Sequence, residues 1–439
     1  MADKQQKLDA LQRLTLLFDD GAYELLDGSA DTGARIAHGT VYGTAVFAYV
    51  EGGCGAFRTA TAGKLAKVYD LAEKTGSPVV AVYDSKGVDL QGGGLTLDAC
   101  AELLHRCSRV SGVVPQIAVV AGTCGGFESV CASLADVCLM ESKAEFFLTA
   151  PFNDLSDSDA KKIAGSAEYA QKASAAAVVC DGEEALFAKT RQLVGMLPSN
   201  NLEAPPFCDF SEPEKNAADD AVLGTVDAGS EIELFAGKGL SSRTYLATVL
   251  GSPVGVVSVS GRVCRNDSLK ISRLVQLCDA FSVPVVTFLD SEGFLVSADN
   301  DMNGGIRNAA ILAHNLSQAT TVKVTVVTGN AIGSLFSVIC GRSASDFRLA
   351  WNGAVIGELA PKAAVAVMWS DRIEKDSDIE RLAVQYAAEE ESAEKAFENG
   401  IIDKVITPET TRSAVSAALD MLAPKRVSNI SRKHGNMPY

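Results

Sequence analysis

The chain has 439 residues, of which 47% are apolar and 21% charged, and its formal net charge is −16. A chain of this length exceeds one ordinary hydrophobic core and predicts two domains. The acidic balance argues against nucleic acid as a bulk partner, although a few local groups suffice to bind a phosphorylated ligand. Four scattered histidines and eleven cysteines without a CxxC pair predict reduced, cytoplasmic thiols and no metal site.

The first half alternates predicted helices and strands, which is typical of an α/β protein. The charged N-terminus lacks the apolar core of a signal peptide, and an amphipathic helix is expected at 8–18. A hairpin candidate at 41–50 leads to the glycine-rich run 52–55, and then come a helix at 63–74, a strand at 78–84 and a helix at 96–110. Acid-rich sequence without periodicity follows, so we expect a first domain over 1–205, a linker over 206–220 and a second domain over 221–439.

The most informative stretch, residues 115–142, reads PQIAVVAGTCGGFESVCASLADVCLMES. Its apolar run at 117–121 is typical of a strand buried on both faces, and it ends in a turn that contains Gly125 and Gly126. A glycine pair at the start of a helix leaves backbone N–H groups that can hold an anion or a thioester oxyanion. The alternative is that the glycines only allow close packing of strand and helix.

The second half repeats the first at a spacing of about 206 residues. The segment 71–87, LAEKTGSPVVAVYDSKG, matches 277–293, LCDAFSVPVVTFLDSEG. The glycine turn also recurs, because IAVVAG at 117–122 matches VTVVTG at 324–329 and Gly126 matches Gly333. These matches predict two copies of one domain, each with one backbone anion site. The apolar window 322–340 contains Lys323 and two glycines, which favours a strand and a helix over a membrane span.

Further segments narrow the assignment: FDDGAYEL at 18–25, SGVVPQI at 111–117, LPSNN at 197–201, CDAF at 278–281, NGIID at 399–403 and HGNMP at 434–438. Together with the repeat, they resemble the carboxyltransferase subunits of biotin-dependent acyl-CoA carboxylases and decarboxylases of the acetyl-, propionyl-, methylmalonyl- and glutaconyl-CoA type. The resemblance covers nearly the whole chain. It implies an α/β fold of two tandem crotonase-like (ClpP/crotonase) β-β-α spiral domains. The N-terminal domain would hold acyl-CoA, and the C-terminal domain would hold carboxybiotin.

The implied chemistry needs hydrogen-bond donors rather than a reactive side chain. Moving a carboxyl group between biotin and a thioester α-carbon develops negative charge on the enolate oxygen and on the ureido oxygen. Each oxygen needs preorganised donors, worth about 3–4 kcal/mol apiece. We expect the first pair on the main chain of Gly87 or Val88 with Gly125 or Gly126. The second set is expected in Gly333, Ser334 and Leu335, and the residues expected to contact the cofactors are Lys86, Thr123, Cys124, Phe294 and Ile332.

Other ionisable residues near these turns have structural explanations. Asp84 and Asp290 follow buried strands and suit turn capping. Glu128 suits a carboxylate that stabilises a helix N-terminus, in preference to an acid or base, and Cys124 suits a packed thiol in preference to a nucleophile. Lys270 and Arg307 are candidates for contacts with CoA phosphates, the alternative being ordinary solvated cations.

Parts of the family pattern are absent, so two classes of function remain open. The glycine-rich GGSxGE loop is not recognisable at 52–58, and DSGGAR is replaced by DSKGVD at 84–89. An active carboxyltransferase, within a carboxylase or a sodium-pumping decarboxylase, agrees with the two glycine turns. A catalytically weak paralogue that supports a conventional carboxyltransferase chain agrees with the altered loops. A hydratase or thioesterase would need a placed acid–base pair.

The resemblance also implies partners. These are a biotin carboxyl carrier protein and either a biotin carboxylase or a membrane decarboxylase subunit. The chain would form a homo-oligomer, a dimer or a trimer of dimers, or a hetero-oligomer with a paralogue, and one active site would use two chains.

Overall fold

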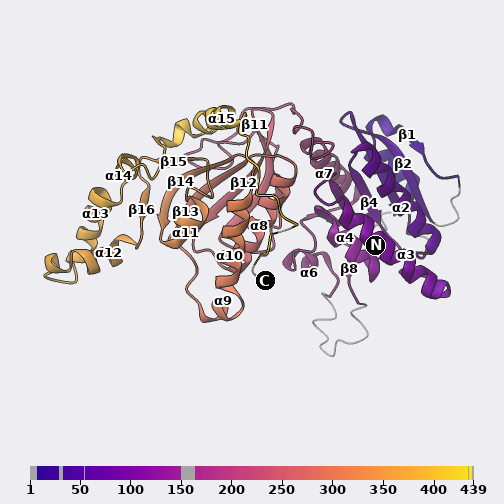
Figure 1. The fold of residues 1–439 in the computed structure, drawn as a ribbon, viewed down its shortest axis with the longest axis horizontal. Coiled ribbons are helices and arrows are strands. Elements are labelled where there is room, and N and C mark those ends of the chain that lie inside the picture. Colours follow the sequence, from indigo (N-terminus) through magenta and orange to yellow (C-terminus); the bar gives the residue numbers. More distant parts are fainter. Residues whose placement is uncertain (1–6, 29–32, 54, 150–163, 434, 438–439) are drawn as a thin grey trace, which may run out of the picture. The chain divides into compact units, whose positions relative to one another are not determined.

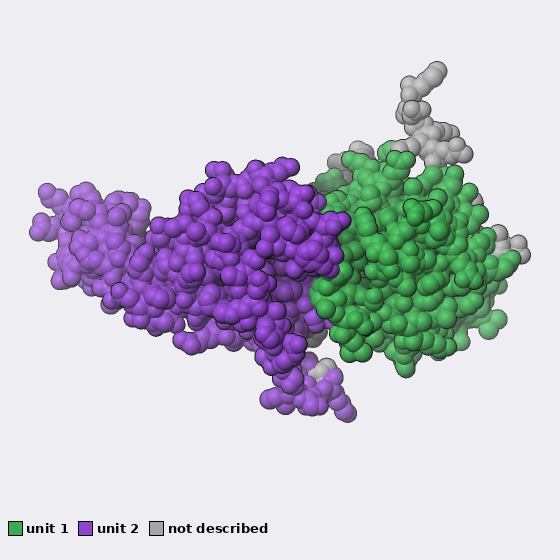
Figure 2. Space-filling view, turned by 90° about the horizontal axis from the view of Figure 1, so that it is seen from above, with its two compact units in different colours: residues 1–206, 235–238 green, residues 207–234, 239–439 purple. Residues whose placement is uncertain are grey.

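The computed structural model describes residues 7–28, 33–53, 55–149, 164–433 and 435–437. Cys54 of the glycine-rich run and His434 and Pro438 of the last motif lie outside the described residues. The chain divides into two compact units, residues 1–206 with 235–238 (unit 1) and residues 207–234 with 239–439 (unit 2), which are coloured separately in Figure 2. The segment 207–220, expected as part of a linker, belongs to unit 2. No helix in the described part of the chain is long and apolar enough to cross a membrane.

Unit 1 is built on a seven-stranded sheet in the order β1-β2-β3-β4-β5-β7-β9 and also contains the short pair β6-β8. Figure 1 labels β1, β2, β4 and β8 of this unit. Its first three strands pair antiparallel and the rest pair parallel. Strands β4, β5 and β7 are fully buried, as expected for apolar runs covered on both faces. The strands are β1 Tyr23–Leu25, β2 Ala34–Val41, β3 Thr44–Glu51, β4 Val79–Tyr83, β5 Gln116–Val120, β6 Thr123–Gly125, β7 Val137–Glu141, β8 Glu145–Phe147 and β9 Val178–Cys180. The helices are α1 Ala10–Leu17, α2 Thr59–Thr75, α3 Gly93–Arg109, α4 Phe127–Leu134, α6 Ala167–Lys172 and α7 Glu183–Met196, with short 3₁₀ turns η1 Asp19–Gly21 and η2 Leu90–Gly92.

Unit 2 follows the same plan with the strand order β10-β11-β12-β13-β14-β15-β17, and β16 also pairs with β14. Its first three strands are again antiparallel and its later pairs parallel. The strands are β10 Ile232–Leu234, β11 Ser242–Val249, β12 Ser252–Ser260, β13 Val285–Ser291, β14 Lys323–Ile332, β15 Phe347–Trp351, β16 Val355–Gly357 and β17 Lys404–Ile406. The helices are α8 Arg265–Ala280, α9 Ala298–Met302, α10 Gly305–Gln318, α11 Ser334–Ile339, α12 Pro361–Met368, α13 Asp378–Glu390, α14 Ala393–Glu398 and α15 Thr411–Leu422, with 3₁₀ turns η3 Ser370–Arg372 and η4 Pro408–Thr410.

In each unit, an aspartate links the turn between two antiparallel strands to an arginine on the last helix. In unit 1, Asp19 accepts hydrogen bonds from the backbone of the β2–β3 turn and from Arg191 of α7 at 2.7 Å. In unit 2, Asp227 accepts from the β11–β12 turn and from Arg412 of α15 at 2.8 Å. Burial opposes ionisation of both carboxyls, but these hydrogen bonds outweigh it and lower their pKa values. The repeat seen in the sequence is therefore also a repeat of side-chain contacts.

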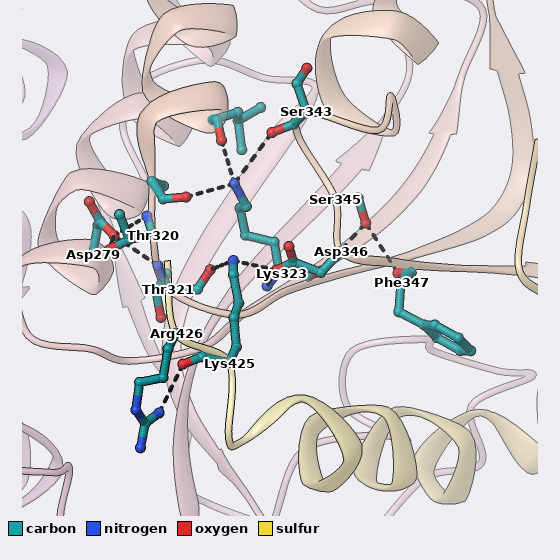
Figure 3. Close-up of polar contacts among 12 residues, drawn as sticks. Asp279, Thr320, Thr321, Lys323, Ser343, Ser345, Asp346, Phe347, Lys425 and Arg426 are labelled. Atoms are coloured by element: carbon teal, nitrogen blue, oxygen red, sulfur yellow. Dashed lines mark hydrogen bonds and ion pairs between the residues drawn. The ribbon is translucent and has the colours of Figure 1, made fainter. Parts of the chain in front are cut away.

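The start of the central strand is also matched between the units. Lys323, buried at the start of β14, donates from Nζ to the carbonyl oxygens of Leu316 at 2.6 Å and Ala319 at 2.8 Å, at the C-terminal end of α10 (Figure 3). Burial lowers the pKa of Lys323. In unit 1, Gln116 at the start of β5 donates its side-chain N–H to the carbonyl of Cys107, near the end of α3, at 3.1 Å. A charged and a neutral side chain thus satisfy the same kind of helix end.

The segment after α15 returns to this part of unit 2. Lys425 donates from Nζ to the carbonyl of Thr321 and to Asp346 Oδ2, both at 2.8 Å (Figure 3). Asp346 Oδ2 also accepts from the backbone N–H of Lys323 at 2.8 Å. The carboxylate therefore joins the C-terminal segment to the start of β14.

We expect Lys323→Ala to lower the free energy of unfolding by about 1–3 kcal/mol, because buried carbonyl oxygens lose their donor. Lys323→Gln should recover much of this loss, since Gln116 serves the same kind of helix end in unit 1. Chemical denaturation measures both changes. The control is Lys362→Ala, which removes an exposed ion pair with Glu380 and should change stability by less than about 0.5 kcal/mol. Equal stability of the alanine variant and the parent would contradict the assigned role.

Candidate active site

In unit 1, the loop at residues 84–89 leaves one backbone donor free. Gly87 has φ of 86°, which favours glycine, and its N–H donates to Ser85 Oγ at 3.0 Å. Phe57 forms backbone hydrogen bonds of 2.9 Å with the residues on both sides of Val88. The N–H of Val88 therefore points away from Phe57. No described residue accepts a hydrogen bond from it.

A second free donor lies on β6. The N–H of Gly126 donates to the carbonyl of Phe147 in β8 at 3.0 Å, so the alternation along the strand turns the N–H of Gly125 away from β8. On that opposite side the carbonyl of Thr123 accepts from the N–H of Ser85 at 3.0 Å. Gly125 has no acceptor among the described residues, and its amide faces the side on which the 84–89 loop is bonded. The sequence left Gly87 or Val88, and Gly125 or Gly126, as alternatives. The geometry leaves Val88 and Gly125 available.

Unit 2 repeats the loop after β13. Gly293 has φ of 111°, and its N–H donates to Ser291 Oγ at 3.1 Å. Val263 forms backbone bonds on both sides of Phe294, so the N–H of Phe294 points away from Val263. Within the described ranges it has no acceptor. Phe294 therefore occupies the place that Val88 occupies in unit 1.

The other donors expected in unit 2 differ in availability. The N–H of Gly333 is already bonded to the carbonyl of Gly357 at 2.8 Å. Ser334 is exposed and Leu335 has a buried side chain, and as the first residues of α11 their N–H groups have no acceptor within that helix. Ile332 ends β14, whose ladder with β13 pairs Ser291 with Ala331.

The remaining predicted contact residues are placed as follows. Lys86 is exposed on the loop of unit 1. Thr123 lines a cavity of about 670 Å³ and donates from Oγ1 to Glu145 at 3.1 Å. Cys124 is fully buried, and burial raises the pKa of its thiol well above the usual value, as a packed residue requires. Lys270 is also buried and donates to the carbonyl of Ser242, so it is not available for a CoA phosphate, contrary to one of the expectations above.

A buried acid cluster, which sequence reasoning missed, lies beneath the loop of unit 1. Glu128, in the first turn of α4, is fully buried and accepts a hydrogen bond from Ser85 Oγ. Glu51, the last residue of β3, accepts from Tyr49 Oη at 2.6 Å and from the N–H of Asp84 at 2.7 Å. The side chains of the two glutamates lie close enough for each to shift the pKa of the other. Burial, and then the charge of Glu51, raises the pKa of Glu128 well above its usual range.

Burial therefore favours the neutral form of Glu128, whereas the sequence favoured a charged carboxylate that stabilises the helix N-terminus. The sequence held one sign of the buried acid cluster: Glu51 ends an otherwise apolar strand directly before Gly52. Its partner in the cluster, Glu128, follows the glycine turn, and the sequence pattern could not distinguish it from an exposed residue in the first turn of a helix.

Asp84 is bound by cations instead. Lys7 Nζ lies 2.6 Å from Oδ1, and the buried Arg13 Nη1 lies 2.9 Å from Oδ2. A Cβ atom at Gly122 would lie 2.0 Å from Asp84 Oδ1, so the carboxylate fills the space that a side chain would need. In unit 2 the same relation holds, because a Cβ atom at residue 329 would lie 2.3 Å from an oxygen of the matched aspartate, residue 290.

Metal binding has no support in the described parts of the chain. No group of three or more His, Cys, Asp or Glu side chains there is arranged to hold a metal ion. The backbone amides left free at the two loops are of a kind that suits an oxyanion.

Comparison with known proteins agrees with this geometry. The chain matches the carboxyl transferase domain family over residues 29–437. It is 30% identical to the methylmalonyl-CoA decarboxylase subunit alpha of Veillonella parvula, over 99% of this chain and 94% of that protein. It is also 30% identical to the propionyl-CoA carboxylase carboxyltransferase subunit of Haloferax mediterranei, over 98% and 93%. The alignment with the Veillonella protein spans 482 positions, so that relative carries residues which this chain lacks.

The fold is matched by solved structures. The transcarboxylase 12S structure with hydrolysed methylmalonyl-coenzyme A bound superposes with a TM-score of 0.91 at 28% identity, over 99% of this chain and 93% of that chain. A single-chain, multi-domain long-chain acyl-CoA carboxylase shares the fold, with a TM-score of 0.81 at 18% identity, over 94% of this chain and 47% of that chain. The crotonase-like fold and the acyl-CoA carboxyltransferase assignment predicted from the sequence are thereby confirmed, and the chain belongs to the carboxyl transferase family.

Proposed function

We propose that this chain transfers a carboxyl group between carboxybiotin on a carrier protein and the α-carbon of a short acyl-CoA. We further propose the propionyl-CoA and methylmalonyl-CoA pair as its substrates. The relatives in Veillonella and Haloferax carry the names of enzymes that act on these two thioesters. The proposal covers both directions, within a carboxylase or within a decarboxylase.

One observation carries the proposal: the free amides of Val88 and Gly125 in unit 1. Val88 lies in the 84–89 loop and Gly125 at the end of β6, the residues next to them are hydrogen-bonded within the fold, and both amides lack an acceptor among the described residues. Two backbone donors from neighbouring segments suit the oxygen of a thioester as it gains negative charge. Unit 1 is thus the proposed acyl-CoA side.

Unit 2 is the proposed biotin side. The N–H of Phe294 corresponds to that of Val88, and the first amides of α11 correspond to those at the start of α4 in unit 1. These groups would hold the ureido oxygen of biotin. Biotin, when bound, supplies the nitrogen that carries the carboxyl group. The residues of this chain orient that oxygen and stabilise charge on it.

The partners proposed are a biotin carboxyl carrier protein, a biotin carboxylase or membrane decarboxylase subunit, and further copies of this chain. Exposed apolar side chains stand close in sequence to each loop, and they are suited to contact with another chain: Leu90, Leu95 and Leu97 in unit 1, and Val296, Met302 and Ile306 in unit 2. We propose that unit 1 of one copy meets unit 2 of another, so that one active site uses two chains.

Purified protein should convert methylmalonyl-CoA and free biotin to propionyl-CoA and carboxybiotin. Liquid chromatography of the thioesters follows the reaction. The methyl-substituted thioester should react faster than malonyl-CoA. Absence of exchange with both thioesters, in folded protein that also fails to bind CoA, would instead support the paralogue that acts as a structural partner.

Val88→Pro tests the backbone donor, because proline removes the N–H. We expect kcat to fall by about 100-fold, the usual effect of removing one oxyanion donor. Val88→Ala is the matched control: it keeps the N–H and should keep kcat within a few-fold of the parent. Circular dichroism and thermal unfolding establish that both variants fold. Equal loss in both variants would show that the side chain matters and the amide does not.

A further inference from the structure

The loop that carries the Val88 amide is tied to the buried acid cluster through one hydroxyl group. Ser85 Oγ accepts the N–H of Gly87 at 3.0 Å, so its own hydrogen is free to be donated, and it is donated to Glu128 Oε2. This bond occupies the amide of Gly87. The next amide, that of Val88, points away from Phe57 and stays without an acceptor among the described residues.

The hydrogen bonds in the cluster identify which acid carries the proton. Both oxygens of Glu51 accept, one from Tyr49 Oη and the other from the N–H of Asp84. Glu128 Oε1 is buried and no described donor reaches it, and the adjacent carboxyl group of Glu51 raises the pKa of Glu128. A proton on Oε1 of Glu128, donated to Glu51, satisfies every atom at once.

Unit 2 provides an internal comparison. Ser291 occupies the place of Ser85 and also accepts the N–H of its glycine, Gly293, at 3.1 Å. Its hydroxyl hydrogen, however, is donated to the carbonyl of Gly261 at 2.6 Å. Leu335 stands where Glu128 stands in unit 1, in the second position of the helix after the glycine turn, and it is fully buried. The fold therefore accepts an apolar residue there, and the acid pair is particular to unit 1.

We propose that Ser85, Glu128 and Glu51 form a positioning chain that aims the Val88 amide at the acyl-CoA thioester, held together by one proton between the two glutamates. None of the three touches the reacting atoms; they act through the loop. The proposal deepens the proposed function, because it concerns the donor on the acyl-CoA side.

The side chains around the two glutamates make loss of this proton unfavourable. The titratable groups around the pair are Tyr49 on β3, Asp84 in the loop, Cys100 on α3 and Cys124 on β6. The nearest cations, Lys7 and Arg13, bind the carboxylate of Asp84, and Arg13 also donates to the backbone carbonyl of Glu51. Loss of the shared proton would leave two adjacent buried carboxylates with no cation bound to either carboxyl among the described residues.

Activity variants test the positioning role. We expect Ser85→Ala and Glu128→Leu, which copies Leu335, each to lower kcat by roughly 10- to 100-fold while the KM for methylmalonyl-CoA changes little, because the donor is lost from the transition state. The kcat of the double variant should be no lower than that of the less active single variant, because both substitutions interrupt the same chain of hydrogen bonds. Glu128→Gln should recover much of kcat, because its amide can donate to Glu51 and its oxygen can accept from Ser85. Additive losses, or wild-type kcat in Ser85→Ala, would overturn the proposal.

The pH profile tests the proton. Since the pKa of Glu128 is raised in the folded chain, the proton is held at low pH and lost as pH rises through that pKa. The kcat of the parent should therefore fall on the alkaline side, and this fall should be absent in Glu128→Gln. Ser291→Ala is the matched control, because its acceptor is a carbonyl that does not titrate; its activity loss should keep the alkaline fall of the parent. An identical alkaline fall in Glu128→Gln would overturn the role of the proton.

A spectroscopic measurement separates this proposal from the proposed function. Infrared spectroscopy of the folded chain near pH 7 should show the C=O stretch of a buried neutral carboxylic acid, and Glu128→Gln should lose this band while keeping any absorption from Glu391, whose pKa burial raises to about 7. The band is expected whether or not the protein exchanges carboxyl groups. Its absence in the parent would overturn the proton assignment, and its presence in an inactive parent would place the failure in the proposed function.

Discussion

A peptide N–H is available to a ligand only where the fold withholds an acceptor from it, and the candidate site depends on this constraint. Buried backbone donors are nearly always satisfied, so a free pair has to be built. In unit 1 this is achieved by satisfying the neighbours: Gly87 is bonded to Ser85, and Gly126 to Phe147. Strand alternation then leaves Val88 and Gly125 directed to the other side. Val88 and Gly125 are therefore available as donors because the amides next to them, and not their own, are hydrogen-bonded within the fold.

The two units apply this design with different supports. Both fix a glycine of positive φ through a serine two residues earlier, and both leave the following amide free. They differ in what holds the serine, a carboxylic acid in unit 1 and a backbone carbonyl in unit 2. A duplicated fold thus keeps the geometry of the donor while the group that holds the serine hydroxyl changes, from an acid that can titrate to a carbonyl that cannot.

The architecture could largely be predicted from the sequence, while the donors that the loops leave available could not be chosen from it. Apolar runs such as Val79–Tyr83, followed by Asp-Ser-x-Gly and repeated in the second half, were sufficient for the strands, the repeat and the fold. The choice between Gly87 and Val88 could not be made, because it depends on a hydrogen bond to Ser85 Oγ, which no pattern of letters encodes. The pairing of Glu51 with Glu128 was also hidden, since the two residues come from distant segments and only burial makes one of them neutral. Lys270 was misjudged for the same reason: its surroundings, not its type, exclude it from a phosphate site.

The close approach of Asp84 to Gly122, repeated by Asp290 and Gly329, has a consequence for how the two halves can diverge. In each pair the carboxylate occupies the volume of the missing side chain, so neither residue can be exchanged without disturbing the other. Distant descendants of the duplication should therefore be easier to recognise by the joint presence of an aspartate after one strand and a glycine after the next than by overall similarity of the halves.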